Sequence, residues 1–257
     1  ITAGSRVICL IQRKGSPIVP QIEIQHVKKY FTNDQKRIAA IDDVSLSIEQ
    51  GEFVFIIGSS GAGKTTLLRL LANQIPADDG RIWVDNLEVT RLRSWHRAAY
   101  RRMIGQVWQD ASLVRKKTVR QNLELVQRAL GVKSKVIPTH TSKALSIVGM
   151  RAMEDRYPFE LSGGQVKMVE LARAIVCKPP ILLVDEITAN LDYDTGWDIM
   201  NILNEINRCG TTVIMATHAK DFVNIMCRRV ITLVAGKVAG DVEKGKYGEL
   251  RATSRFE

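Results

Sequence analysis

One stretch of the chain decides its fold. It reads Phe53-Val54-Phe55-Ile56-Ile57 and continues as Gly58-Ser59-Ser60-Gly61-Ala62-Gly63-Lys64-Thr65. The first five residues are apolar and rich in β-branched and aromatic types, which is typical of a strand buried on both faces. The glycine-rich turn then leads into an apolar run at 67–71, which indicates a helix. The spacing of the glycines, the lysine and the threonine is that of a phosphate-binding loop (P-loop), in the strand–turn–helix context that this pattern requires.

The P-loop pattern predicts a nucleotide site. Its glycines let consecutive N–H groups point inward as a nest for an anion, and the helix N-terminus adds partial positive charge. Lys64 can reach the β- and γ-phosphates, and the Thr65 hydroxyl can bind Mg²⁺. We therefore expect ATP and Mg²⁺ as cofactors. The expected contacts in the loop are Gly58, Ser59, Ser60, Gly61, Ala62, Gly63, Lys64, Thr65 and Thr66.

Composition narrows the class of protein. The chain has 257 residues, 45% hydrophobic and 25% charged, which suits a globular fold with a substantial core. No apolar run approaches the roughly 20 residues needed to cross a bilayer. The cysteines form no C-x-x-C pair, so a zinc site or disulfide framework is not expected.

The chain is strongly basic, with a net charge of +10. Such an excess predicts an anionic partner, which can be nucleic acid, an anionic lipid surface or an acidic protein. Alternatively, the charges form a solvated helix face. The crowded basic residues are Arg91, Arg93, Arg97, Arg101, Arg102, Arg115, Lys116, Lys117 and Arg120.

The rest of the chain alternates between strand and helix patterns. Residues 1–20 show no periodicity, and we expect a flexible arm that need not be native. Strands are expected at 22–31, 41–48, 81–84, 104–108, 181–184, 211–217, 230–234 and 237–241, with a polar turn at 32–37. Helices are expected at 92–103, at 118–130 with Thr118 as N-cap, at 143–148, at 166–176 and at 194–207. The sequence thus predicts an α/β fold.

Two further segments carry candidate chemistry. Asp185-Glu186 ends an apolar run, and the carboxyl ends of parallel strands are where ligands bind, so both carboxylates are expected beside the P-loop. The alternative for this pair is a helix cap. Leu161-Ser162-Gly163-Gly164-Gln165 opens a second helix whose free N–H groups can hold a phosphate, although it is not a second P-loop.

In chain order, the P-loop, the LSGGQ sequence at 161–165, Asp185-Glu186 and His218 at a strand end resemble the ATP-binding cassette (ABC) family. The resemblance covers roughly residues 21–245. It implies a P-loop NTPase with a RecA-like core, an antiparallel β-subdomain and a helical insertion at about 110–165, with a C-terminal tail at 246–257.

The resemblance also implies roles for single residues. Lys64, Glu186 and His218 are expected to be catalytic, with Glu186 as the general base that orients the attacking water and His218 on the γ-phosphate. Thr65, Gln109 and Asp185 are expected around Mg²⁺. Phe31 aligns with the aromatic residue that stacks on adenine, although Tyr30 is a close rival, and either ring can instead pack at a strand end.

The signature sequence implies a second copy. In the family, the residues Ser162, Gly163, Gly164 and Gln165 cap an ATP bound to another subunit, so a head-to-tail homodimer holding two ATP molecules is expected. Ala189-Asn190-Leu191-Asp192 resembles the segment that joins the two sites. Two departures stand out, Ile187 where proline is usual and Val166-Lys167-Met168 where Gln and Arg are usual. They put the rate and the packing of this helix in doubt, not the reaction.

The flanking stretches resemble the cell-division branch of the family. They are 51–58, Gln109-Asp110 with Thr118-Val119 and Asn122, 206–208 with 210–218, and 228–230 with Gly236 and 245–248. This implies an integral membrane permease as partner, a place at the cytoplasmic face of the plasma membrane, and signalling to peptidoglycan hydrolases within the cell-division machinery. The alternatives are the ATPase of a lipoprotein-release or solute transporter, a soluble DNA-repair or translation protein, and a nucleotide-binding scaffold. Nucleic acid is not expected as a partner.

Overall fold

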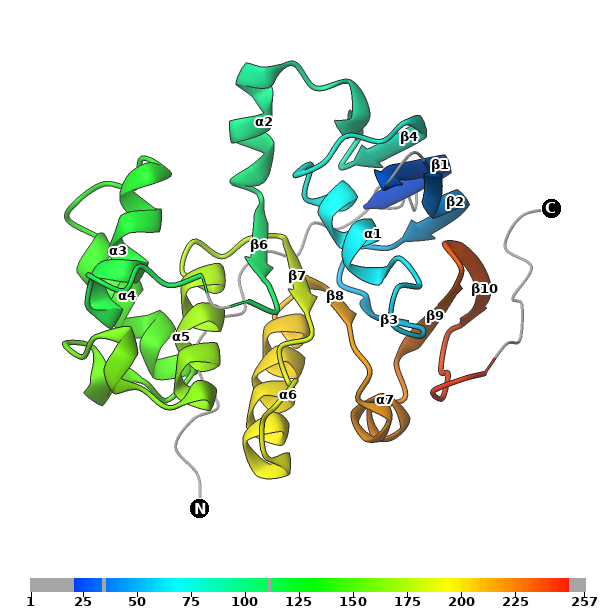
Figure 1. Ribbon diagram of the computed structural model, residues 1–257. Coiled ribbons are helices and arrows are strands. Elements are labelled where there is room, and N and C mark those ends of the chain that lie inside the picture. The colour runs from blue at the N-terminus through cyan, green and yellow to red at the C-terminus, as the bar shows by residue number, and fades with distance from the viewer. Residues whose placement is uncertain (1–20, 34–35, 111, 250–257) are drawn as a thin grey trace.

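The computed structural model describes residues 21–33, 36–110 and 112–249. The predicted arm at 1–20 and the end of the predicted tail lie outside the described residues. Two sheets and the helices around them form the structure (Figure 1). They show the predicted α/β fold of a P-loop NTPase.

The larger sheet carries the P-loop. Its six strands run in the order β10-β9-β3-β8-β7-β6. Strand β3 pairs in parallel with β8 and β9, β7 pairs in parallel with β8 and β6, and β10 is an antiparallel edge. The strands are β3 (Phe53–Ile57), β6 (Ile104–Val107), β7 (Ile181–Asp185), β8 (Thr212–Ala216), β9 (Arg229–Val234) and β10 (Lys237–Val242).

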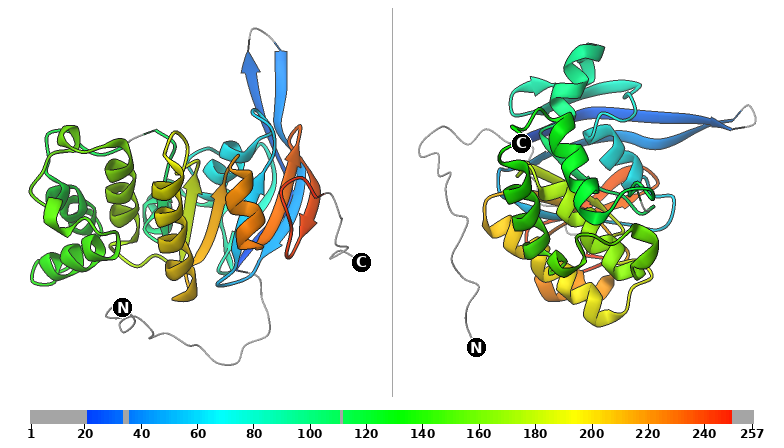
Figure 2. Two further views of the ribbon diagram at one scale, coloured as in Figure 1. Left: turned by 90° about the horizontal axis from the view of Figure 1, so that it is seen from below. Right: turned by 90° about the vertical axis from the view of Figure 1, so that its left-hand side faces the viewer.

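The smaller sheet is antiparallel, in the order β2-β1-β4-β5. Its strands are β1 (Ile22–Asn33), β2 (Lys36–Ile48), β4 (Asp79–Val84) and β5 (Leu87–Glu88). The paired β1 and β2 project well beyond the body of the molecule (Figure 2).

The predicted polar turn at 32–37 is wrong over most of its length. Thr32 pairs with Arg37 and Asn33 with Lys36, so the ladder continues through them. The Arg37 guanidinium lies 3.8 Å from the centre of the Tyr30 ring, which adds a cation–π contact. Cross-strand hydrogen bonds and this contact outweigh the turn propensity of the individual residues.

The helices largely follow the predicted pattern. Thr118 caps α3 with a capping box closed by Gln121, as predicted. The short helix α7, which follows His218, was not predicted. The helices are α1 (Lys64–Leu71), α2 (Ser94–Arg101), α3 (Val119–Ala129), α4 (Ile137–Ile147), α5 (Gly163–Ile175), α6 (Tyr193–Arg208) and α7 (Lys220–Met226).

Each face of the larger sheet has its own core. Along β3, Phe53, Phe55 and Ile57 pack into one cluster with residues of α3 to α7. Val54 and Ile56 face the other way, into a cluster with α1 and the smaller sheet. The helices α3, α4 and α5 lie together beyond the β6 edge (Figure 1). The fold therefore places the P-loop and the start of α5 on different parts of the molecule.

Candidate nucleotide-binding site

The P-loop is pressed against the backbone of neighbouring strands. Gly63 has φ of 104°, and a Cβ atom there would lie 2.4 Å from the Ala40 carbonyl oxygen. Gly58 has φ of 151°, and its Cβ would lie 2.3 Å from the Leu233 carbonyl oxygen. Both positions need glycine because the fold itself leaves no room for a side chain.

Lys64 is buried and fully hydrogen-bonded. Its Nζ donates to the carbonyl oxygens of Gly58 at 3.0 Å and Ser59 at 3.1 Å, and to His218 Nε2 at 2.8 Å. An ammonium has three donors, so this side chain is satisfied within the loop. Burial lowers the pKa of Lys64, and the nearby Glu186 and Asp185 partly offset that effect. The lysine is thus held at the place where the loop predicts phosphate.

Glu186 and His218 meet beside Lys64. Since Lys64 can only donate, His218 Nε2 is the acceptor and the neutral ring carries its proton on Nδ1. Glu186 Oε2 accepts the His218 backbone N–H at 3.3 Å, while its Oε1 is buried without a hydrogen-bond partner, 3.5 Å from Nε2. Burial raises the pKa of Glu186, and the hydrogen bond from the His218 backbone N–H and the charge of Lys64 oppose this shift.

Backbone conformation brings Glu186 into this position. Its φ of 50° lies in the left-handed region, which is strained for a side chain other than glycine. Its N–H donates to the Ala216 carbonyl oxygen at 3.0 Å, at the end of β8. Strand β8 lies between β3 and β7 in the sheet. The segments that follow the carboxyl ends of these three strands carry Lys64, His218 and Glu186, and they are therefore neighbours.

Asp185 and Thr65 fit a magnesium ion. Asp185 is only 2% exposed and hydrogen-bonds the Thr65 side chain, yet its Oδ1 has no partner among the described residues. Burial raises the pKa of Asp185, against the hydrogen bond from Thr65. A buried carboxylate oxygen without a partner is costly, and oxygen ligands of this kind suit Mg²⁺.

Gln109 lies near the same edge of the sheet. Val107 of β6 is in register with Val184 of β7, so the segment after β6 emerges beside Asp185. The Gln109 residue is exposed, and its carbonyl oxygen accepts from Lys167 Nζ at 2.7 Å. The structure thus brings this predicted metal residue to the edge that carries the carboxylates.

Both aromatic candidates for the adenine contact, Phe31 and Tyr30, lie on β1, after a register shift between Lys29 and Tyr30. Phe31 is 46% exposed, and Lys29 Nζ lies 5.6 Å from its ring centre, so the two side chains share one face of β1. Lys29 is paired with Ile41, whose side chain lies against Gly63. The Tyr30 ring instead lies against the Arg37 guanidinium.

The signature residues stand apart from this cluster. Ser162 caps α5 in a capping box with Gln165, and a Cβ atom at Gly163 would have no atom within 4 Å outside its own helix. Gly164 lies against Thr195 in the first turn of α6. Within the described residues, no hydrogen bond or ion pair joins residues 162–165 to residues 58–66. The chain's own P-loop therefore does not use its own signature sequence.

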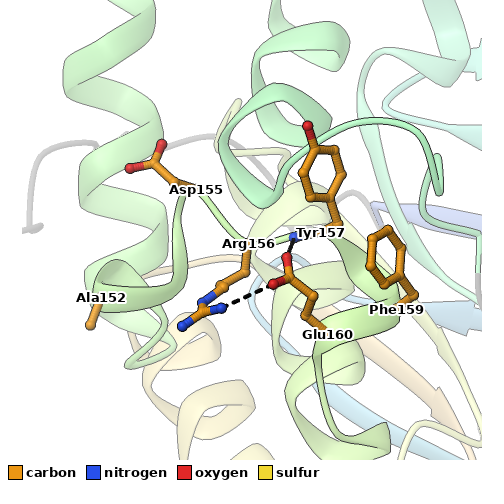
Figure 3. Close-up of a pocket in the computed structure, with 6 residues that line it drawn as sticks. All are labelled: Ala152, Asp155, Arg156, Tyr157, Phe159 and Glu160. Carbon is orange, nitrogen blue, oxygen red and sulfur yellow. Dashed lines mark hydrogen bonds and ion pairs between the residues drawn. The ribbon is translucent and has the colours of Figure 1, made fainter.

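Two hollows lie away from the P-loop. One, of about 510 Å³, directly precedes the signature sequence (Figure 3). In it Arg156 pairs with Glu160 at 2.9 Å, and the rings of Tyr157 and Phe159 stack 5.5 Å apart, with Phe159 76% exposed. The other, of about 370 Å³, is lined by Arg101, Arg102, Ile104, Gly105, Gln106, Trp108, Ser112, Val126, Leu130, Arg173, Ala174, Cys177 and Pro179.

Sequence reasoning missed the side chains that hold the segment after β6. These are Lys167, Glu170 and Arg173 of α5, which contact residues 108–112. The only signal in the sequence was the spacing of two opposite charges three residues apart on the predicted helix. Such a pair is usually solvent-exposed, and nothing in the local pattern shows that it is buried.

Comparison with known proteins agrees with this site. Residues 41–189 match the profile of a protein family described as "ABC transporter". The chain belongs to the ABC transporter family, as a member that binds and hydrolyses ATP.

The relatives narrow the branch. The cell division ATP-binding protein FtsE of Mycobacterium tuberculosis is 40% identical over 88% of this chain and 98% of its own length. FtsE of Bacillus subtilis is 37% identical over the same shares. The methionine import ATP-binding protein MetN of Vibrio cholerae is 37% identical over 92% of this chain, but only 68% of its own length.

A solved structure shares the fold. The dimeric ATP-binding cassette MJ0796, bound to ADP and Pi after hydrolysis, matches with a TM-score of 0.81 and 29% identity. The match covers 88% of this chain and 100% of that one. In the described part of the present chain, no helix has the length and apolarity needed to cross a bilayer.

Proposed function

We propose that this chain is the ATP-hydrolysing subunit of an FtsE-type membrane complex in cell division, acting as a head-to-tail homodimer with two ATP molecules and Mg²⁺. One observation carries the proposal. Lys64, Asp185, Glu186 and His218 gather on one side of a phosphate site, while Ser162–Gln165 present an uncovered helix N-terminus elsewhere. Similarity to FtsE over nearly its whole length supports the branch.

The residues of the site divide the work. Lys64 exchanges the carbonyl oxygens of Gly58 and Ser59 for phosphate oxygens when ATP binds. Thr65 and Asp185, with Gln109, would hold Mg²⁺, which supplies charge neutralisation for the phosphates. Glu186 accepts a proton from the attacking water at Oε1, the oxygen that its neighbours leave unbonded.

His218 and Lys64 act on the phosphates of ATP. Freed from Lys64, the His218 ring can carry its proton on Nε2 and donate it to a γ-phosphate oxygen, and Lys64 balances charge on the phosphates. Signature residues Ser162–Gln165 of the second copy then cover the phosphate with free N–H groups. ATP binding thus closes the dimer, and ATP hydrolysis opens it again.

The partner is an integral membrane permease of the FtsX type. The 370 Å³ hollow between α2, β6 and α5 includes Trp108 and Ser112, on either side of Gln109. A segment of the permease bound in this hollow would be displaced when Gln109 moves. We propose that the complex signals across the membrane to peptidoglycan hydrolases rather than moving a solute.

Two residues of a strongly basic stretch, Arg101 and Arg102, line the same hollow. Residues 89–123 hold nine Lys or Arg and one Asp, a net +8 of the chain's +10. Arg102, Arg115 and Lys116 are exposed, and within the described residues none of them is paired with a carboxylate. We propose that they face anionic lipid at the cytoplasmic side of the plasma membrane, where each such charge contributes about 1 kcal/mol.

A vesicle assay tests the lipid contact. The variant Arg115→Ser/Lys116→Ser/Lys117→Ser should bind vesicles of mixed anionic and neutral phospholipid roughly 100-fold more weakly at low salt, from about 1 kcal/mol per charge. The control Lys133→Ser/Lys135→Ser removes exposed charges outside this stretch and should bind as wild type. Equal binding by both variants would reject the lipid-facing surface.

Purification of the native complex tests the function. The tagged chain is cross-linked in its own membranes and the proteins bound to it are identified. A permease with four membrane spans and a large extracytoplasmic loop supports the cell-division role. A solute permease would instead favour a transport ATPase, the alternative that similarity to MetN keeps open.

A further inference from the structure

A buried carboxylate lies in the middle of α5, outside the nucleotide cluster. Glu170 is 1% exposed. Its Oε1 accepts the Ser112 backbone N–H at 2.5 Å and the Ser112 hydroxyl at 3.1 Å. A buried glutamate needs such partners, and here they come from the segment that follows Gln109.

Lys167 completes the contact one turn earlier. Its Nζ donates to Glu170 Oε2 at 3.1 Å, to the Gln109 carbonyl oxygen at 2.7 Å and to the Trp108 carbonyl oxygen at 3.1 Å. All three ammonium donors are used, and two of them hold the backbone of the predicted metal residue and its neighbour. Lys167 and Glu170 therefore bind the two ends of the segment 108–112.

Arg173 adds a third point. Its guanidinium donates to the Ser112 carbonyl oxygen at 2.8 Å and also to the Ser112 hydroxyl. Ser112 thus has its N–H, its carbonyl and its hydroxyl bound by one face of α5. We call Lys167, Glu170 and Arg173 the α5 clamp.

We propose that the α5 clamp positions Gln109, and thereby couples the ATP site of this chain to the ATP that its own signature sequence covers on the second copy. The inference rests on the proposed homodimer. Ser162 and Glu170 belong to one helix, about 12 Å apart along its axis at 1.5 Å per residue. A helix moves as a unit, so closure of its N-terminus on the partner's ATP displaces Gln109 in this chain's own site.

Stability alone does not account for these residues. A buried ion pair contributes little net stability, because the cost of removing both charges from water offsets their attraction. Such pairs are better explained where they fix one arrangement of the backbone. Of the three residues, Lys167 lies in the stretch where Gln and Arg are usual in the family, so one member of the clamp departs from the pattern.

The test uses a neutral double variant, Lys167→Met/Glu170→Gln, because removing one partner alone would leave a buried charge. Calorimetry of ATP binding over a series of Mg²⁺ concentrations should show a Mg²⁺ requirement raised about 10-fold, the lower end of the loss seen when groups that orient metal ligands are removed. Binding of ATP without Mg²⁺ should stay within about twofold of wild type, since the clamp does not touch the P-loop. Hydrogen exchange at the Ser112 amide should accelerate.

The second readout is cooperativity. The Hill coefficient of ATP hydrolysis should fall toward 1 in the double variant and stay at the wild-type value in Glu124→Gln/Arg128→Gln, which removes an ion pair on α3. A lower melting temperature with unchanged Mg²⁺ requirement would show a merely structural pair and overturn the proposal.

The proposed homodimer has its own check. If Glu186→Gln forms an ATP-dependent dimer while wild type hydrolyses ATP with a Hill coefficient of 1, the coupling is overturned and the proposed function stands. If Glu186→Gln forms no dimer, the proposed function itself fails.

Discussion

Two helices of this molecule begin with glycines and free N–H groups, and they differ in what surrounds them. At the start of α1, Lys64 contacts His218, and Thr65 contacts Asp185, so this helix end is surrounded by groups of its own chain. At the start of α5, the side chains of Ser162 and Gln165 accept from each other's backbone N–H groups, and Gly163 is exposed. The first end already has partners within its own chain, and the second is left for something outside it.

The glycines make the same distinction. Gly63 is required by the fold, since its φ of 104° and the Ala40 carbonyl exclude a side chain. Gly163 is required by nothing in the chain, since a Cβ atom there would meet open space. A need for glycine at 163 therefore arises only when a ligand or a second copy approaches.

The largest effect is expected from Glu186→Gln. Loss of the general base should reduce kcat roughly 1,000-fold, within the range for such groups, while ATP binding persists. The variant should then hold ATP between two copies, and light scattering at saturating ATP-Mg²⁺ should show a dimer. A monomer under those conditions would show that the N-terminus of α5 does not bind ATP on a second copy.

Next comes a pair of glycine substitutions. Gly63→Ala should destabilise the protein by about 1–3 kcal/mol or more from backbone strain. Gly163→Ala should leave the melting temperature unchanged or slightly raised, yet cut ATP hydrolysis about 100-fold, because the added methyl group meets the phosphate of the other copy. Melting curves and turnover of the two variants, measured side by side, check this. Full activity of Gly163→Ala would show that this glycine faces no ligand.

The two ends also differ in how well the sequence predicted them. The P-loop was readable because its glycines and its strand–helix context are local. Likewise, the N-cap at Thr118 and the adjacent strands predicted at 230–234 and 237–241 depend on neighbouring residues, and the structure confirms both.

Contacts between distant residues were not readable. The turn at 32–37 failed because the pairing of β1 with β2 outweighs the preferences of single residues. The clamp joins Glu170 to Ser112, 58 positions away, and no local pattern reveals that burial. The role of Ser162–Gln165 came from family resemblance, because an exposed helix end carries no information about its partner.

Mixing two inactive variants sharpens the comparison. Lys64→Ala removes the phosphate-binding group of one end, and Gly163→Ala blocks the other. In a mixed dimer, one site combines both defects, while the other joins an intact P-loop to an intact signature sequence. Random pairing makes half the dimers mixed, so about a quarter of wild-type activity should return. If turnover stays at the level of the separate variants, the two ends do not meet across copies.

The smallest effect is expected from the aromatic residue that stacks on the adenine base. Phe31 is 46% exposed, whereas the Tyr30 ring already contacts the Arg37 guanidinium. Phe31→Ala should therefore raise the Kd for ATP about 2- to 10-fold, the value of one aromatic stacking contact, and Tyr30→Ala should change it less than twofold. The same substitutions should not alter binding of inorganic triphosphate, which has no base to stack. Equal losses for ATP and triphosphate would place the effect of Phe31 in the loop rather than on the base, and a larger loss for Tyr30→Ala would reverse the assignment.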